Sequence, residues 1–262
     1  MYAFGHGLTY TPFEYTNLQL SADTIDAAET VNINVDVTNT GTQASDEVVQ
    51  MYVRANQSRV KRPFLQLKGF QRVHFAPGQT KTVHFTLPAS ELAIWDVTQD
   101  KWTVESGVFD ILLGRSSADI KLTASLTVQG ETIPPRNLTQ PTRAENFDDY
   151  AGAKLVDEMK VEGTAVSATA PGDWIAFKDA DFGSGVSNFT ATVANANPEP
   201  LNLEIRLDEP NGPLLGTLAV PITGDVYAWT AVSTPIKEIS GIHDLYLVFS
   251  DVFRISSFHF HN

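Results

Sequence analysis

The chain contains no cysteine and only 3 methionines among its 262 residues. The absence of cysteine excludes disulfide bonds and cysteine-ligated metal sites, so the folded state depends on packing alone. No apolar run reaches the length of about 18 residues that a membrane-spanning helix needs. The first residues, Met1 to His6, lack the basic-then-apolar order of a secretion signal peptide. We therefore expect a soluble chain whose export signal, if it has one, lies outside this sequence.

Basic residues are scarce, since 18 Lys and Arg stand against 31 Asp and Glu, which gives a formal charge of -13. Residues 1–130 carry 10 basic and 13 acidic side chains, and residues 131–262 carry 8 and 18, so the two halves are -3 and -10. The second half would repel a polyphosphate, which argues against nucleic acid and anionic membranes as partners. The charge fits a neutral ligand such as a glycan, or it serves solubility alone.

The first half of the chain alternates apolar and polar residues with a period of two. Val31, Ile33, Val35 and Val37 alternate with polar residues up to the turn at 39–41, which is typical of a half-buried strand. Residues 48–53, 82–87 and 108–113 repeat the pattern, and residues 90–94 offer one short helical turn. About seven strands in roughly 110 residues favour an immunoglobulin-like or fibronectin-like sandwich.

A proline-rich stretch separates this region from a second set of short apolar segments. Residues 129–143 contain Pro134, Pro135 and Pro141 and little that could form a core, which predicts an extended linker. Strands are expected beyond it at residues 174–177, 188–193, 203–207, 214–220, 229–233, 243–249 and 254–260. We therefore predict an all-β protein of two tandem β-sandwiches, over residues 1–128 and 144–262, of which the second is a jelly roll.

Residues 1–128 carry an ordered set of short motifs. They are Phe4-Gly5-His6-Gly7-Leu8-Thr9-Tyr10-Thr11, Val37-Thr38-Asn39-Thr40-Gly41, Glu47-Val48-Val49-Gln50-Met51-Tyr52-Val53, Arg62-Pro63, Leu67-Lys68-Gly69-Phe70 and Trp102-Thr103-Val104-Glu105-Ser106-Gly107. In this order the set resembles the C-terminal fibronectin type III-like domain of family 3 glycoside hydrolases. The resemblance implies that the first motif is the exit from a preceding α/β domain.

The same resemblance implies that the catalytic residues of such enzymes lie upstream, with the nucleophile in a Ser-Asp-Trp context. The one Asp-Trp pair here, Asp173-Trp174, follows a glycine in the other half of the chain. A glycosidase needs two facing carboxylates about 5 to 10 Å apart, and 31 acidic residues provide close pairs by chance. We therefore assign no catalytic residue to this chain.

Residues 142–262 carry a second ordered set. It comprises Ala144-Glu145-Asn146, Gly172-Asp173-Trp174, Asp181-Phe182-Gly183, Glu204-Ile205-Arg206-Leu207-Asp208, Leu215-Gly216-Thr217, the loop from Tyr227 to Thr230 and Asp244-Leu245-Tyr246-Leu247-Val248-Phe249. The set resembles a family 6 carbohydrate-binding module. Such modules bind glycans at a cleft among the edge loops, on the concave sheet face, or at both.

The resemblance assigns Trp174 to the stacking tryptophan of the sheet face and places Asp208 near its carboxylate position. Period-two alternation agrees, because Trp174 faces away from Ile175 and Phe177. An indole can stack on a sugar face while a carboxylate accepts rim hydroxyls. The alternatives are a core tryptophan and a turn residue in Asp208-Glu209-Pro210-Asn211-Gly212.

The edge cleft of the family uses two aromatic rings, the first about six positions before the Gly-Asp-Trp tryptophan. That position falls near Ala168, and no aromatic residue stands there. Tyr227 and Trp229 remain in the later loop as candidate ligand residues, and Tyr227 is favoured because it lies nearer the turn. Both rings are two residues apart and share a face, so packing is the alternative.

Glu145 matches the glutamate that ligates a structural calcium in the family, and Asp148 and Asp149 lie close to it. Calcium prefers several oxygen ligands, so the expectation is a possible structural calcium, with a solvated acidic turn as the alternative. His259 and His261 share a strand face without a third ligand.

These patterns together predict the non-catalytic accessory region of a β-glucosidase or β-xylosidase. We expect it to bind β-glucan, xylan or a related oligosaccharide, to work with upstream catalytic domains, and to act outside the cell or in a periplasm. The alternatives are a structural module that docks on the catalytic domains and binds no sugar, and a freestanding lectin-like protein.

Overall fold

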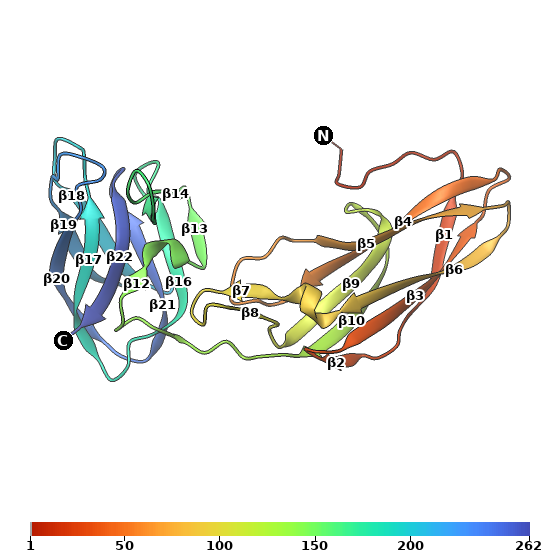
Figure 1. Ribbon diagram of the computed structural model, residues 1–262, viewed down its shortest axis with the longest axis horizontal. Helices are drawn as coiled ribbons and strands as arrows, with labels where there is room; N and C mark the ends of the chain where they lie inside the picture. Colours follow the sequence, from red (N-terminus) through yellow and green to blue (C-terminus); the bar gives the residue numbers. More distant parts are fainter. Residues whose placement is uncertain (1) are drawn as a thin grey trace. The chain divides into compact units, whose positions relative to one another are not determined.

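A computed structural model describes residues 2–262, which form strands, turns and two short 3-10 helices, η1 (Ala89–Leu92) and η2 (Ala144–Asn146) (Figure 1). None of the helices within residues 2–262 is long and apolar enough to span a bilayer. The chain divides into two compact units. The first unit comprises residues up to Ser58 with Arg62–Ile133, and the second comprises Arg59–Lys61 with Pro134–Asn262. Each unit is a β-sandwich, so the predicted all-β class with two tandem sandwiches is confirmed.

The first unit packs a three-stranded sheet against a five-stranded sheet. The smaller sheet has the order β1 (Phe13–Leu20), β3 (Thr30–Asn39), β6 (Thr80–Pro88). The larger has the order β2 (Thr24–Asp26), β10 (Asp119–Gln129), β9 (Gly107–Ser116), β4 (Ser45–Ala55), β5 (Gln66–Phe75), and a hairpin is formed by β7 (Ile94–Asp96) and β8 (Lys101–Thr103). The four apolar residues of the alternating segment in β3 are fully buried, as its period of two predicts.

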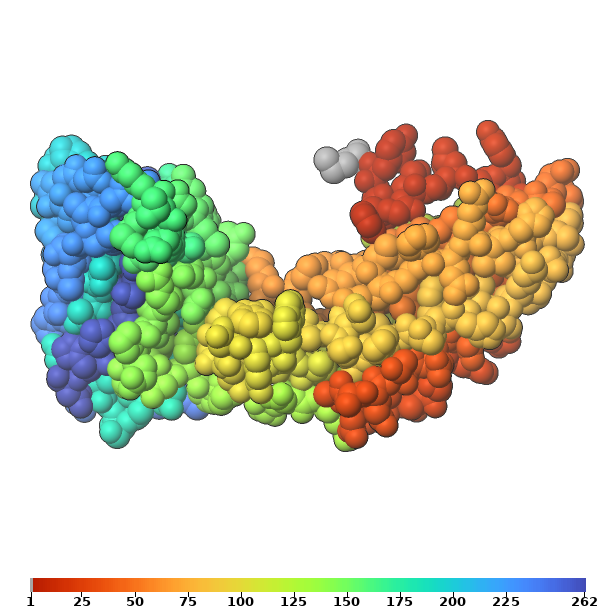
Figure 2. Space-filling model, in the orientation of Figure 1, coloured from red at the N-terminus to blue at the C-terminus, as the bar shows by residue number. Residues whose placement is uncertain are grey.

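Residues 4–9 lie over the outside of this sandwich. Gln50 Nε2 donates a hydrogen bond to the carbonyl of Gly5 at 3.0 Å. Between the segment and the sheet lies a pocket of about 360 Å³ whose lining includes Phe4, Leu8, Phe70 and Arg115. In Figure 2 the segment, in red, stands above the orange surface of β4 and β5 of the same unit.

The second unit consists of two sheets that we call the front sheet and the back sheet. The front sheet has the order β11 (Arg136–Asn137), β16 (Trp174–Asp181), β21 (Ile242–Phe249), β18 (Leu201–Leu207), β19 (Leu214–Val220), and β13 (Asp149–Ala151) also pairs with β16. The back sheet has the order β14 (Lys154–Asp157), β15 (Thr164–Ser167), β22 (Arg254–His261), β17 (Val186–Ala194), β20 (Thr230–Ile239), and β12 (Thr142–Arg143) pairs with β22.

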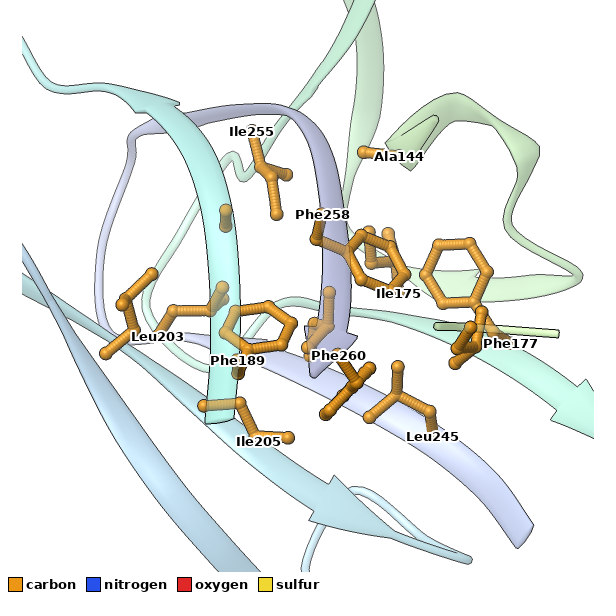
Figure 3. Close-up of a cluster of buried hydrophobic side chains, with 14 of the residues drawn as sticks. Ala144, Ile175, Phe177, Phe189, Leu203, Ile205, Leu245, Ile255, Phe258 and Phe260 are labelled. Atoms are coloured by element: carbon orange, nitrogen blue, oxygen red, sulfur yellow. The ribbon is translucent and has the colours of Figure 1, made fainter. Parts of the chain in front are cut away.

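Aromatic rings from both sheets fill the core of the second unit. Figure 3 shows Phe177 of the front sheet reaching toward Phe258 of the back sheet, and their ring centroids are 4.8 Å apart in an edge-to-face contact. Ile175 and Leu245 also point into this core and are fully buried. Successive residues of a strand point to opposite faces of the sheet. Because Trp174 immediately precedes the core residue Ile175 in β16, its side chain must point to the outer face of the front sheet.

The structure differs from the predicted linker in its second part. Residues 136–143 lie in the second unit, where β11 pairs with β16 and β12 pairs with β22. Leu138 is fully buried in the core, and Arg136 forms a buried ion pair with Asp148 at 2.9 Å. A single apolar residue between prolines gives no periodic signal, which is why the sequence pattern could not assign this segment to a sandwich.

Candidate functional site

The outer face of the front sheet brings together side chains from β16, β21 and β18. In the strand register, Trp174 lies opposite Val248, and Val248 lies opposite Glu204. One pair further along, Tyr246 lies opposite Arg206. We call this group, Trp174, Tyr246, Glu204 and Arg206 together with Asp208 just beyond β18, the sheet-face site.

Two aromatic rings form the centre of the sheet-face site. Trp174 is half-buried and lies outside the hydrophobic core. Its ring meets that of Tyr246 edge to face, with centroids 5.1 Å apart and planes at 61°. Tyr246 is buried, with 9% of its surface exposed. The pair therefore forms a supported aromatic surface on the outside of the sandwich.

The residues before Trp174 fix the start of its strand. Asp173 Oδ2 accepts hydrogen bonds from the backbone N–H groups of Thr169 and Ala170 at 2.6 and 2.9 Å and from the Thr169 hydroxyl at 2.9 Å. Burial would raise the pKa of Asp173, but these hydrogen bonds outweigh it and hold the pKa below its ordinary value. Asp173 therefore acts here as a turn anchor that positions Trp174.

Gly152 is required beside this carboxylate. It has a φ of 72°, and a Cβ at this position would lie 1.8 Å from Asp173 Oδ1. The Asp173 carboxylate packs directly against the Gly152 backbone, in the space that a Cβ at position 152 would occupy. Only glycine combines that approach with the left-handed conformation.

Polar groups border the two rings of the sheet-face site. Arg206 Nε donates to Glu204 Oε2 at 2.7 Å, and Arg206 Nη1 donates to the carbonyl of Gly212 at 2.7 Å. These contacts hold the guanidinium and the carboxylate in fixed positions on the outer face. Each group keeps further donor or acceptor capacity beyond the bonds described.

Asp208 lies at the end of β18 with a left-handed φ of 66°. Its Oδ1 accepts a hydrogen bond from the Asp244 backbone N–H at 3.3 Å and lies 3.6 Å from His243 Nδ1, while 59% of the side chain stays exposed. Burial raises the pKa of the Tyr246 hydroxyl, and the charges of Asp244, Asp149 and Asp208 raise it further. The Tyr246 hydroxyl therefore stays protonated at neutral pH.

The other two predicted ligand residues lie in a different place, which we call the loop cluster: Tyr227 and Trp229 with Lys160 and Arg254. The Tyr227 ring lies 5.1 Å from the Arg254 guanidinium carbon and 5.9 Å from Lys160 Nζ. The Trp229 indole N–H donates to the carbonyl of Glu158 at 2.8 Å. Arg254 Nη1 donates to the carbonyls of Asp157 and Val226. The structure thus separates the predicted ligand residues into two groups.

The edge-cleft position near Ala168 is fully buried, and its backbone N–H bonds to the carbonyl of Phe253 at 3.3 Å. No aromatic side chain stands there. The ligand role of Tyr227 and Trp229 stays a prediction. Of the two aromatic positions in the family's edge cleft, the one near Ala168 has no aromatic residue in this chain.

Glu145, the predicted calcium ligand, faces an arginine. Its two carboxylate oxygens lie 3.3 and 3.2 Å from Arg143 Nε and Nη2. Asp148 pairs with Arg136, so these acids do not share one site. Within residues 2–262, no three His, Asp or Glu side chains gather as a metal-binding group. Calcium binding stays a prediction, and the contacts of Glu145 do not fit a calcium ligand set.

Sequence reasoning named Asp208 but missed Tyr246, Glu204 and Arg206. The signal was present, since residues two apart in a strand share a face. The same alternation that puts Trp174 outside puts Glu204 and Arg206 on the face of Asp208. The register between β18 and β21, which brings Tyr246 beside them, is visible only in the folded sheet.

The sequence matches two known families. The model of the carbohydrate binding module (family 6) matches residues 143–262, and that of the fibronectin type III-like domain matches residues 47–117. Neither matched segment is a catalytic domain.

The chain is similar to parts of larger enzymes. It is 39% identical over 162 residues to the thermostable beta-glucosidase B of Acetivibrio thermocellus. The aligned region covers 61% of this chain and 22% of that relative. The chain is 48% identical over 131 residues to a beta-xylosidase of Formosa agariphila, and the aligned region covers 49% of this chain and 18% of that relative. The crystal structure of a GH3 beta-glucosidase from Bifidobacterium adolescentis is 34% identical, with a TM-score of 0.47, and covers 51% of this chain and 19% of that one.

The chain spans about a fifth of the length of the curated relatives it matches. Its two matched segments follow each other in the order that the sequence motifs implied. The chain therefore contains a fibronectin type III-like domain followed by a family 6 carbohydrate-binding module, and it is related to the C-terminal part of family 3 glycoside hydrolases.

Proposed function

We propose that the sheet-face site binds a neutral β-linked plant polysaccharide, such as xylan or β-glucan, and so holds a β-glycosidase near its substrate. The observation that carries the proposal is the half-buried Trp174, packed edge to face on Tyr246 outside the core and bordered by Glu204, Arg206 and Asp208. The family of residues 143–262 supports a glycan as the ligand.

The chemistry of the site suits a pyranose ring. A pyranose has a face rich in C–H groups and a rim of hydroxyls, so the indole can contact the face while carboxylates and the guanidinium bond to the rim. Ring contact with burial contributes about 1 to 3 kcal/mol, and a charged hydrogen bond contributes about as much. The sum corresponds to dissociation constants of roughly millimolar to micromolar.

Weak binding of this kind is useful when it is tethered. A module that holds a polysaccharide keeps the local concentration of chain ends high near a linked catalytic domain. We propose a β-glucosidase or β-xylosidase as that enzyme, in keeping with the relatives. Because polysaccharides of this size do not enter cells, the same proposal implies action outside the cell or in a periplasm.

Affinity electrophoresis and calorimetry with soluble xylan, soluble β-glucan and their oligosaccharides test the site. We expect retention of the wild type and loss of retention for Trp174→Ala, with an unchanged fold by circular dichroism. The matched control is Trp102→Ala in the first unit, which removes an indole that is 68% exposed and also paired edge to face. This control should bind like the wild type.

Three outcomes contradict the proposal. Equal binding by the Trp174→Ala variant places the ligand elsewhere, and a wild type that binds none of the glycans favours the structural docking module. Loss of binding in both tryptophan variants would also contradict it, because the two indoles lie in different units.

A further inference from the structure

Arg143, at the end of β12, lies among oxygen atoms of the second unit. Its Nη2 donates to Glu158 Oε2 at 2.7 Å and to the carbonyl of Thr164 at 2.5 Å. Its Nη1 contacts Glu158 Oε1 at 3.2 Å and the hydroxyl of Ser256 at 3.4 Å. With the two oxygens of Glu145, the guanidinium meets two carboxylates, one carbonyl and one hydroxyl.

These oxygens come from four separate segments of the unit. Glu145 lies in η2, Glu158 follows β14, Thr164 begins β15, and Ser256 lies in β22. Ser256 also bonds to Glu158 through its hydroxyl. A cation at this point therefore joins the start of the module to a loop and to the back sheet.

The electrostatics of the cluster favour a positive charge at this point. Hydrogen bonds from the Arg143 guanidinium hold the pKa of Glu158 below its ordinary value despite partial burial. Without a cation, the carboxylates of Glu145 and Glu158 would lie near each other in a region whose residues 131–262 already carry a formal charge of -10. Like charges at short range destabilise the folded state.

Two carboxylates, a carbonyl and a hydroxyl are also oxygen ligands that Ca²⁺ accepts. The family resemblance implies a structural calcium at Glu145, and the side chain that stands against Glu145 here is a guanidinium. We propose that Arg143 supplies, as an internal cation, the charge that a structural calcium would supply, so that the second unit needs no calcium for its stability. This inference is independent of the proposed glycan site.

The internal cation also has a consequence for the loop cluster. The carbonyl of Glu158 accepts the indole N–H of Trp229, while the carboxylate of the same residue binds Arg143. Arg143 therefore fixes the position of Glu158, whose carbonyl accepts the hydrogen bond from Trp229. Loss of the guanidinium would loosen the loop cluster together with η2.

Differential scanning calorimetry of the full chain, with EDTA and with millimolar CaCl2, tests the inference. We expect the wild type to unfold at the same temperature in both conditions and to give no calcium-binding heat in titration calorimetry. Arg143→Gln, which keeps a polar side chain but shortens it and removes the charge, should lower the midpoint of the second unit by about 5 °C or more in EDTA. Calcium should then restore part of that loss.

Arg254→Gln is the matched control, because Arg254 lies in the same unit and donates to backbone carbonyls. Its midpoint should not respond to calcium. If Arg143→Gln does not fold in EDTA, refolding in the presence of calcium and the charge-preserving Arg143→Lys variant replace it. Arg143→Lys should fold in EDTA with a midpoint between those of the wild type and Arg143→Gln.

Three results would overturn the inference. The first is a wild type whose midpoint falls in EDTA or rises with calcium. The second is an Arg143→Gln variant as stable in EDTA as the wild type. The third is a destabilised Arg143→Gln variant that calcium does not stabilise at all, because the surrounding oxygens would then not form a cation site.

Discussion

The sheet-face site and the loop cluster each present one tryptophan and one tyrosine, yet the protein uses them differently. In the loop cluster, the Trp229 N–H bonds to a backbone carbonyl and the Tyr227 ring contacts two cations. In the sheet-face site, the two rings support each other edge to face. Within residues 2–262, no hydrogen-bond acceptor contacts the Trp174 indole N–H.

The difference shows what makes an aromatic side chain available to a ligand. An aromatic residue contributes to recognition when its face and its polar atom are not already engaged within the protein. The indole N–H of Trp229 and the ring face of Tyr227 are engaged in contacts with neighbouring loops. Trp174, in contrast, is positioned by its backbone and by Tyr246. Substitutions should therefore change ligand binding at the sheet-face site and stability at the loop cluster.

The largest effect beyond Trp174 itself is expected from Asp173→Ala. This change removes three hydrogen bonds to one carboxylate oxygen and frees the turn before Trp174. We expect a loss of about 2 kcal/mol in unfolding free energy and at least a few-fold weaker glycan binding. Chemical denaturation and affinity electrophoresis measure the two effects.

Asp225→Ala is the matched control beside the loop cluster, because Asp225 Oδ1 accepts one hydrogen bond from the Tyr227 backbone N–H at 2.7 Å. It should cost less than about 1 kcal/mol and leave glycan binding unchanged. Equal loss of binding in the two aspartate variants would erase the distinction between the two groups.

The next effect is expected from Trp229→Phe. An aromatic ring is kept, although it is smaller than indole, and the carbonyl of Glu158 loses its indole donor. We expect about 1 kcal/mol lower unfolding free energy, measured by urea denaturation, and unchanged affinity for xylan or β-glucan. A loss of affinity without a loss of stability would make Trp229 a ligand residue, as its sequence position suggested.

A smaller effect is expected from Tyr246→Phe. The edge-to-face contact with Trp174 is kept, and only the hydroxyl is removed, which we propose bonds to the rim of the sugar. We expect about five-fold weaker glycan binding, since one neutral hydrogen bond contributes about 1 kcal/mol. Tyr227→Phe, measured in the same titration, should show no change in affinity.

The sequence predicted the strands of both sandwiches well because alternation is a local signal. Val31 to Val37 in β3, and Ile175 and Phe177 in β16, are buried where a period of two requires it. The 3-10 turn near residues 90–94 was also anticipated, and η1 covers Ala89–Leu92. Structure that each strand determines by itself was therefore accessible.

The site was only partly predictable because it depends on register and on long-range partners. Trp174 and Asp208 could be named from their own strands, but Tyr246 joins them only through the pairing of β21 with β16 and β18. Arg143 was not named at all, because its four oxygen-bearing partners extend to Ser256 at the other end of the module. Contacts across 113 positions leave no periodic trace in a single sequence.

The smallest effect is expected from pH, and it isolates the anchor of the sheet-face site. The pKa of Asp173 is lower in the folded than in the unfolded state, so the carboxylate stabilises the fold fully above its unfolded pKa of about 3.9. That contribution disappears as the pH falls through the lower folded pKa. The difference in unfolding free energy between the wild type and Asp173→Asn should therefore be constant from pH 7 to about pH 5 and shrink below pH 4. Urea denaturation at each pH measures it, and a difference that grows on acidification would show that Asp173 is not held as a carboxylate by Thr169 and Ala170.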